Sequence, residues 1–74
     1  MAEYNGHKSW NYWNVSLWIN NDEPLYRWAR SLAKKHSSLD LAAAELYESL
    51  KDDKTPDGAS YTKGAIRAAI TDIL

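Results

Sequence analysis

The feature that most constrains the fold of this chain is a tryptophan-rich stretch near its N-terminus, residues 10–22. It carries three of the four tryptophans in the chain. A buried aromatic side chain removes roughly 150–250 Å² from water, which stabilises a fold by about 4–6 kcal/mol as an upper bound. No other segment offers comparable core material. We therefore expect this stretch to build the core, and we expect Trp13 and Trp28 to be buried.

Two secondary structures are compatible with this stretch. A strand would explain why Val15, Leu17 and Ile19 alternate with polar residues, but Trp18 interrupts the alternation. A helix places the aromatic and aliphatic residues on two adjoining sides, so it would be apolar over most of its circumference. Its remaining polar stripe would consist of Asn11, Asn14 and Asn21. We favour the helix and expect it to be the central one of the fold.

Three further amphipathic segments follow. Pro24 falls in the first turn of the first segment, where its missing N–H costs nothing, and apolar residues then recur with helical spacing. The candidate N-caps are Ser9, Ser37 or Ser38, and Ser60 or Thr62. A Pro56-Asp57-Gly58 turn separates the last two segments. The sequence therefore predicts an all-α fold, a compact bundle of about four short helices at approximately residues 10–20, 23–36, 38–52 and 61–74.

Length and composition indicate a single helical domain over residues 1–74, with residues 1–8 as an irregular N-terminal arm. The absence of cysteine excludes a disulfide framework, a thiolate zinc site and a cysteine nucleophile. The N-terminus lacks the features of a signal peptide, and no apolar run approaches the ~18 residues of a membrane span. We therefore expect a cytoplasmic protein with no membrane partner.

Metal and cofactor sites find little support in the sequence. Asp53-x-Thr55-x-Asp57-Gly58 resembles the start of a calcium loop, but the glutamate required at the twelfth position is replaced by Gly64. We interpret this segment as an ordinary connecting turn. His7 and His36 lie in different elements, without a second ligand at helical spacing. We expect His7 to be solvent-exposed and His36 to lie at a helix C-terminus. No metal and no cofactor are predicted.

Catalytic motifs are also missing from the sequence. It has no Gly-x-Ser-x-Gly elbow and no glycine-rich phosphate loop. The carboxylates Glu45 and Glu48 are expected on an outward helical face, where nothing would raise a carboxyl pKa for acid catalysis. We therefore expect that the protein is not an enzyme.

Charge is unevenly distributed along the chain. Residues 21–36 carry four bases and two acids, whereas residues 37–57 carry six acids and two bases. These charges are ordinary for solvated helix faces, but a basic row could also follow the phosphates of a nucleic acid. The connection over residues 51–60 is too long for a helix-turn-helix, and the pI of about 6.0 is low for a nucleic-acid-binding domain. Nucleic-acid binding or transcriptional regulation is therefore the alternative function.

The N-terminal third carries a specific motif. Tyr4-Asn5-Gly6 is followed by Trp13-x-Val15-x-Leu17-Trp18-Ile19-x-Asn21-Asp22-Glu23. Over residues 4–28 this resembles a group of short, mostly uncharacterised phage and mobile-element proteins with the pattern Tyr-Asn-Gly-x-x-Asn-Tyr-x-Thr-Trp-x-Val-x-Leu-Trp-x-x-Asn-Asp. The sequence departs from the pattern at Ser9, Trp10 and Tyr12. The resemblance implies a phage or plasmid origin, but it implies no reaction and no site residue.

Surplus aromatic surface favours protein binding. A bundle of 74 residues has difficulty covering four tryptophans and five tyrosines, and Trp, Tyr and Arg dominate binding hot spots. Together with the resemblance, this predicts a small inhibitor that docks onto a host or defence-system protein, such as a CRISPR effector or a restriction enzyme. A symmetric homodimer is another use of such a surface. The expected partner-binding residues are Trp18, Tyr26, Arg27, Arg30, Lys34, Tyr47 and Tyr61.

Overall fold

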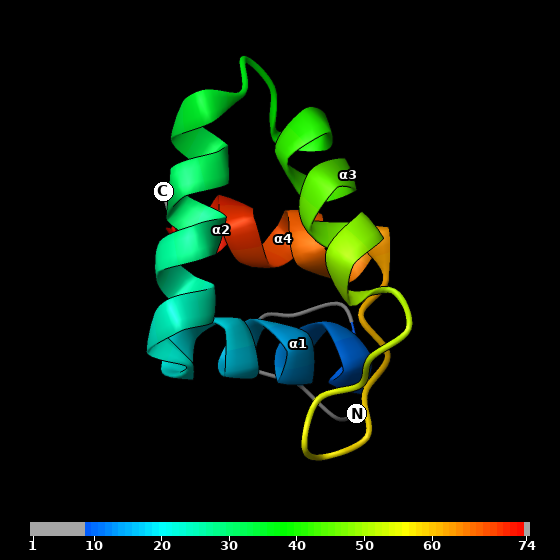
Figure 1. Ribbon diagram of the computed structural model, residues 1–74. Helices are drawn as coiled ribbons and strands as arrows, with labels where there is room; N and C mark the ends of the chain where they lie inside the picture. The colour runs from blue at the N-terminus through cyan, green and yellow to red at the C-terminus, as the bar shows by residue number, and fades with distance from the viewer. Residues whose placement is uncertain (1–8, 74) are drawn as a thin grey trace.

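In the part of the chain that the structure describes, four helices are arranged around an aliphatic core (Figure 1). The computed structural model describes residues 9–73, so the predicted arm at residues 1–8 lies outside the described residues, as does His7. The helices are α1 (Trp10–Asn21), α2 (Glu23–Lys35), α3 (Leu39–Leu50) and α4 (Lys63–Ile73). The predicted all-α bundle is therefore confirmed, and residues 13–19 are helical. Within residues 9–73, none of the helices has the length and apolarity needed to cross a membrane.

Each helix begins at a polar residue that satisfies a free backbone N–H group. The Ser9 hydroxyl accepts from the Tyr12 N–H at 3.3 Å, and the Ser38 hydroxyl accepts from the Leu41 N–H at 3.2 Å. An Asp22 carboxylate oxygen caps α2 in the same way at 3.1 Å. Before α4, the Thr62 hydroxyl accepts from the backbone of the first turn at 3.1 Å. These caps explain where the helices start, because side-chain oxygens replace the partners that helical geometry cannot supply.

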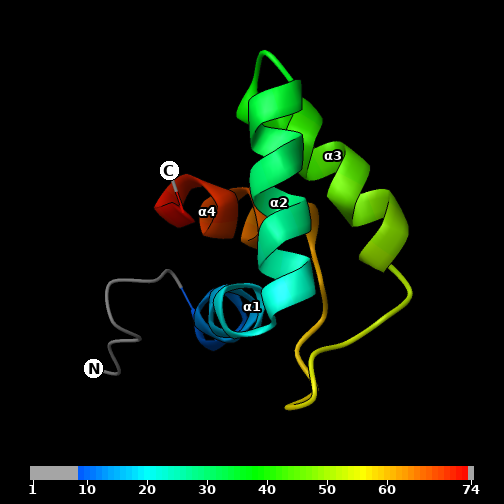
Figure 2. The same cartoon turned by 60° about the vertical axis from the view of Figure 1, so that its left-hand side comes forward.

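The central helix of the fold is α4, not α1 as the sequence led us to expect. Its strongest packing is against α1 and α3, and it also contacts α2. Figure 2 shows α1 nearly end-on beneath α2, with α4 crossing behind α2. Small side chains permit this arrangement, because alanines let helix backbones approach closely. The buried alanines of α3 and α4 are Ala42, Ala43, Ala65 and Ala69.

The tryptophans lie around the core and not within it. Trp28 is 38% exposed and Trp10 is 40% exposed, while Trp13 and Trp18 are half-buried. The expectation that Trp28 is buried was therefore wrong, and Trp13 is only partly covered. An indole is too large to be enclosed fully in a core of this size, which isoleucines, leucines and alanines fill instead. The protein consequently exposes more aromatic surface than it would if its tryptophans were buried in the core.

One polar stripe of α1 attaches the connection between α3 and α4. The Asn14 amide donates to an Asp57 carboxylate oxygen at 2.9 Å, and the Trp18 indole N–H donates to the same oxygen at 2.9 Å. The buried Thr55 hydroxyl donates to the Asn14 amide oxygen at 2.5 Å and accepts from the Ala59 N–H at 3.0 Å. This network joins residues more than 35 positions apart, so α1 determines the conformation of the connection.

The connection itself turns at the predicted proline-glycine site. The Gly58 N–H donates to the Thr55 carbonyl oxygen at 2.8 Å, and Gly58 has a φ of +95°, which glycine adopts without strain. Beyond the turn, the Asn11 amide exchanges two hydrogen bonds with the Ser60 backbone at 3.0 and 3.1 Å. The predicted turn is confirmed, and two asparagines of the predicted polar stripe, Asn11 and Asn14, bind the connecting segment through their side-chain amides.

Candidate functional site

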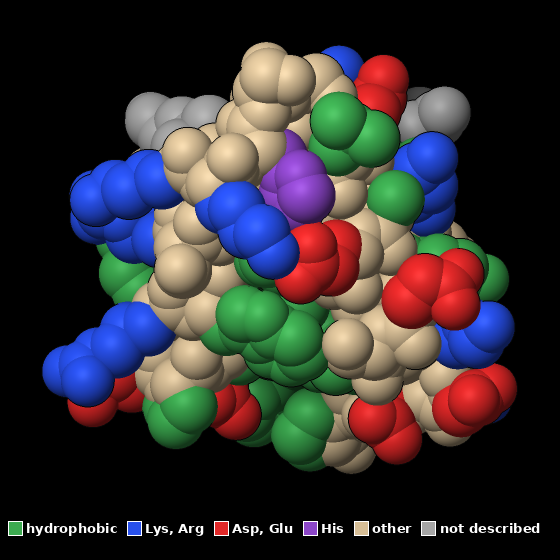
Figure 3. All heavy atoms as spheres, turned by 45° about the horizontal axis from the view of Figure 1, so that its top comes forward, with side chains coloured by type: hydrophobic (Ala, Val, Ile, Leu, Met, Phe, Trp, Pro, Cys, Tyr) green, Lys and Arg blue, Asp and Glu red, His purple; other side chains and the backbone are tan. Residues whose placement is uncertain are grey.

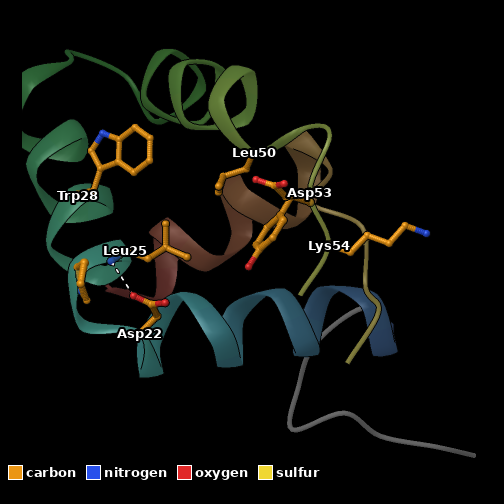
Figure 4. A pocket seen from close by; sticks show the side chains of 8 residues that line it. Asp22, Leu25, Trp28, Leu50, Asp53 and Lys54 are labelled. Atoms are coloured by element: carbon orange, nitrogen blue, oxygen red, sulfur yellow. Dashed lines mark hydrogen bonds between the residues drawn. The ribbon is translucent and has the colours of Figure 1, made fainter. Parts of the chain in front are cut away.

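A groove of about 400 Å³ opens where the α1–α2 junction faces the C-terminal end of α3 (Figure 4). One wall comes from the start of α2, the opposite wall comes from the end of α3 and the residues after it, and a tyrosine just before α4 completes the lining. The groove is lined by Asp22, Pro24, Leu25, Trp28, Leu50, Asp53, Lys54 and Tyr61. Because these segments are distant in sequence, the groove exists only in the folded chain.

The groove is largely apolar and aromatic. Figure 4 shows Trp28, Leu25 and Leu50 turned toward a shared space. Tyr61 also lines this space and is only 7% exposed, because its ring belongs to the hydrophobic core. Among residues 9–73, its hydroxyl has no hydrogen-bond partner. The hydroxyl is not enclosed, because none of the buried side-chain polar atoms in the described residues lacks a partner, so it is accessible from the groove and can bind a polar group placed there.

Two carboxylates give the groove a negative potential. Asp22 caps α2 with one carboxylate oxygen, and Asp53 follows the end of α3. Burial raises the pKa of the Tyr61 hydroxyl, and the nearby charges of Asp22 and Asp53 raise it further. Lys54 is the basic residue of the lining, and Figure 4 shows its side chain pointing away from the groove. The charge balance therefore favours a cation.

The predicted basic residues form a separate stripe on the outward face of α2. Arg27 pairs with Glu23 at 3.2 Å, and Arg30 contacts Tyr26, with 5.9 Å from its guanidinium carbon to the ring centroid. Lys34 is exposed one turn further on. Figure 3 shows Lys and Arg side chains gathered over α2, with Asp and Glu side chains over α3. The structure thus brings Tyr26, Arg27, Arg30 and Lys34 together, but on a different side of α2 from Trp28.

The other predicted partner-binding residues are distributed differently. Trp18 is half-buried, and its indole N–H is occupied by Asp57. Tyr47 is half-buried against the core. Tyr61 is buried, so the expectation that it is exposed was wrong: its position before α4 carries the ring inward. The groove could not be predicted from the sequence, because Trp28 has the helical spacing of an ordinary core residue.

A polar cluster lies at the connection between α2 and α3, remote from the groove. The His36 Nε2 atom lies 2.7 Å from a Glu45 carboxylate oxygen, and the Lys35 ammonium lies 3.5 Å from the same oxygen. The hydrogen bond with His36 lowers the pKa of the Glu45 carboxyl, as does the charge of Lys35. Over residues 9–73, no three His, Asp or Glu side chains are grouped so that they could hold a metal ion. This cluster therefore joins two helices.

Comparison with known proteins places the chain in a family. No curated protein and no solved structure matches it. A family with the description "Family of unknown function (DUF7249)" matches residues 1–74. Because that match spans the whole sequence, the chain belongs to the DUF7249 family.

Proposed function

We propose that this chain is a small, non-enzymatic protein-binding module. In its most specific form, the proposal is a phage-encoded inhibitor that occupies one host protein stoichiometrically and blocks a defence system, either a CRISPR effector or a restriction enzyme. The class of target rests on the resemblance of residues 4–28 to phage and mobile-element proteins. Protein binding rests on the surface described above.

The observation that carries the proposal is the placement of the large aromatic side chains. A domain of this size stabilises itself by burying as much apolar surface as it can. Here Trp10 and Trp28 remain more than a third exposed, although each could bury far more area than the alanines that fill the core. Trp28 also lines the groove, and a partly exposed tryptophan next to a groove is typical of surfaces that bind another protein, because its remaining apolar area is buried in the complex.

The groove supports this function better than the basic stripe does. Trp28 combines exposure with apolar neighbours on two sides, Leu25 and Leu50, so a partner side chain can be desolvated there. On the basic stripe, Arg27 is already paired with Glu23, and it does not line the groove. Paired, fully solvated charges contribute little to affinity. Nucleic-acid binding through the stripe is therefore the less supported function.

Capture of a partner from bacterial lysate tests the proposal with matched variants of the tagged chain. Trp28→Ala removes the wall of the groove, and Trp10→Ala removes an equally exposed indole elsewhere. Arg27→Glu/Arg30→Glu reverses the charge of the basic stripe. We expect one host protein to be retained by the wild type, the Trp10 variant and the arginine variant, and to be lost from the Trp28 variant. Circular dichroism of each bait checks that it is folded.

The captured protein is then purified and titrated against the wild-type chain by calorimetry, and its biochemical activity is measured across the same titration. We expect a saturable one-to-one complex and a loss of activity that follows its formation. Release of the captured material by nuclease, together with its loss from the arginine variant, would establish the nucleic-acid alternative instead. A folded wild-type bait that retains nothing, or a concentration-dependent dimer that buries Trp28, would contradict the proposal.

A further inference from the structure

We propose that the groove between the α1–α2 junction and the end of α3 binds an arginine side chain presented by a protein partner. This inference deepens the proposed function and rests on it, since it names the chemistry that the partner brings. Three features of the groove carry it: negative charge, an accessible tyrosine hydroxyl that has no partner among residues 9–73, and an aromatic and aliphatic wall.

The first feature is the charge. Asp22 and Asp53 line the groove from opposite walls, while the ammonium group of Lys54 is directed away from it. Asp22 uses one carboxylate oxygen to cap α2 and has a second, and Asp53 has no ion pair among residues 9–73. Both carboxylates are exposed to solvent, and two of them at one groove favour a cationic ligand.

The second feature is the Tyr61 hydroxyl. The residue as a whole is only 7% exposed, but its hydroxyl is accessible from the groove and has no hydrogen-bond partner in the described part of the chain. It nevertheless lies close enough to Asp22 and Asp53 for both charges to act on it. A guanidinium group has five N–H donors in a fixed plane, enough to reach two carboxylates and one phenol oxygen together. An ammonium group is a compact, strongly hydrated charge and matches this spread of acceptors less well.

The third feature is the wall. Leu25 and Leu50 offer apolar surface for the three methylene groups of an arginine, and the Trp28 ring offers a face on which a guanidinium plane stacks. Asp22 and Leu25 are joined by the capping hydrogen bond, so this side of the groove is held in place before a ligand arrives. Stacking and ion pairing therefore act on the same group.

The shape of the groove indicates that the arginine belongs to a protein. Sites for free small molecules usually enclose most of the ligand surface. This groove is wide open to solvent, so a free cation would stay largely hydrated within it. An arginine that is anchored to a macromolecule gains additional contacts with the other residues of the lining, which include Pro24 and Lys54. The open shape thus favours a side chain from a partner protein over a small amine.

The test uses the full-length chain and a blocked pentapeptide, acetyl-Ala-Leu-Arg-Leu-Ala-amide. Its control replaces arginine by citrulline, which has the same shape without the charge. Binding is followed by NMR, through the indole N–H of Trp28 and the backbone amides of Leu25 and Asp53. We expect saturable shifts at these groups with the arginine peptide and none with the citrulline peptide. Asp53→Asn and Tyr61→Phe should each weaken binding by about threefold to tenfold.

Asp52→Asn is the matched control, because Asp52 is an exposed neighbour of the same charge that does not line the groove. It should leave the affinity within a factor of about two. Equal weakening by Asp52→Asn and Asp53→Asn would show that only overall charge matters and would overturn the proposal. Shifts confined to other surfaces, or no shift at millimolar peptide, would also overturn it. If free arginine binds as tightly as the peptide, the ligand of the groove is a small cation and not a side chain of a protein partner.

Failure of this inference is distinguishable from failure of the proposed function. If the arginine peptide does not bind, but a host protein is still captured by the wild type and lost from the Trp28→Ala variant, the groove binds a partner through other chemistry. If the peptide binds with the expected dependence on Asp53 and no host protein is ever captured, the groove binds arginine, but the proposal that a host protein supplies this arginine is contradicted.

Discussion

Replacing Thr55 by valine should destabilise the fold far more than its exchange of a single hydroxyl for a methyl group suggests. Thr55 is 4% exposed and lies in the connection between α3 and α4. Its hydroxyl donates to the Asn14 amide oxygen at 2.5 Å and accepts from the Ala59 N–H at 3.0 Å. Valine has nearly the same shape, so the substitution removes two hydrogen bonds without leaving a cavity.

The magnitude follows from the groups that lose their partners. Asn14 and Ala59 are each 1% exposed, so water cannot replace the lost hydroxyl at either group. A buried polar group without a partner costs about 1–3 kcal/mol, so two of them should lower the free energy of unfolding by about 2–6 kcal/mol. A domain of this size has a total stability of about 4–11 kcal/mol. Each kcal/mol of this loss corresponds to a fall in Tm of about 4–8 °C.

The assay is urea unfolding followed by far-ultraviolet circular dichroism, with Thr71→Val as the control. Thr71 is exposed, and its hydroxyl donates to the Arg67 carbonyl oxygen within α4, so the same chemical change there should cost less than about 0.5 kcal/mol. An unchanged m-value would show that both variants unfold from comparable native states. If Thr55→Val and Thr71→Val cost the same, the network between α1 and the connection does not hold the fold together.

Three further predictions concern acid stability and packing. The hydrogen bonds from Asn14 and then Trp18 lower the pKa of the Asp57 carboxyl. The stabilising contribution of the ionised Asp57 carboxylate is therefore complete above the pKa of an unfolded aspartate, near pH 4, and it is lost as the pH falls through the lower pKa of the folded state. The Tm difference between wild type and Asp57→Asn should be constant above about pH 5 and shrink below about pH 4. A Cβ at Gly64 would collide with the Tyr12 hydroxyl and lie 3.3 Å from its Cζ atom, so Gly64→Ala should gain the usual helix propensity of about 1 kcal/mol only in a Tyr12→Phe background. Strict additivity in that double-mutant cycle would argue against the contact. Ala69→Leu places a larger side chain at a fully buried position of α4 and should lower the free energy of unfolding by about 1–3 kcal/mol, as measured with urea. Ala68→Leu, at a half-buried position, should lower it less. Equal losses would mean that α4 does not pack closely at Ala69.

Much of the secondary structure could be predicted from local patterns. The four helices lie close to their expected positions because helix starts depend on a cap and its first turn, which are neighbours in sequence, as at Ser9 and Ser38. The break before α2 follows from Asp22 and Pro24, and the turn before α4 follows from Pro56 to Gly58. Each of these features depends on residues within about five positions of one another, so the sequence alone contains the necessary information.

Only the tertiary structure decided which apolar residues became core and which became surface. Periodicity assigned Trp28 and Ala29 to the same inward face, but packing encloses Ala29 and leaves Trp28 at the groove. Tyr61 was expected among the partner-binding residues and Asn14 on a polar stripe, but both are buried because residues distant in sequence cover them. The physical reason is side-chain volume. Helical spacing gives the direction in which a side chain points, whereas the space available to it depends on neighbours that are distant in sequence. Small alanines fit into a closely packed core that has no room for an indole.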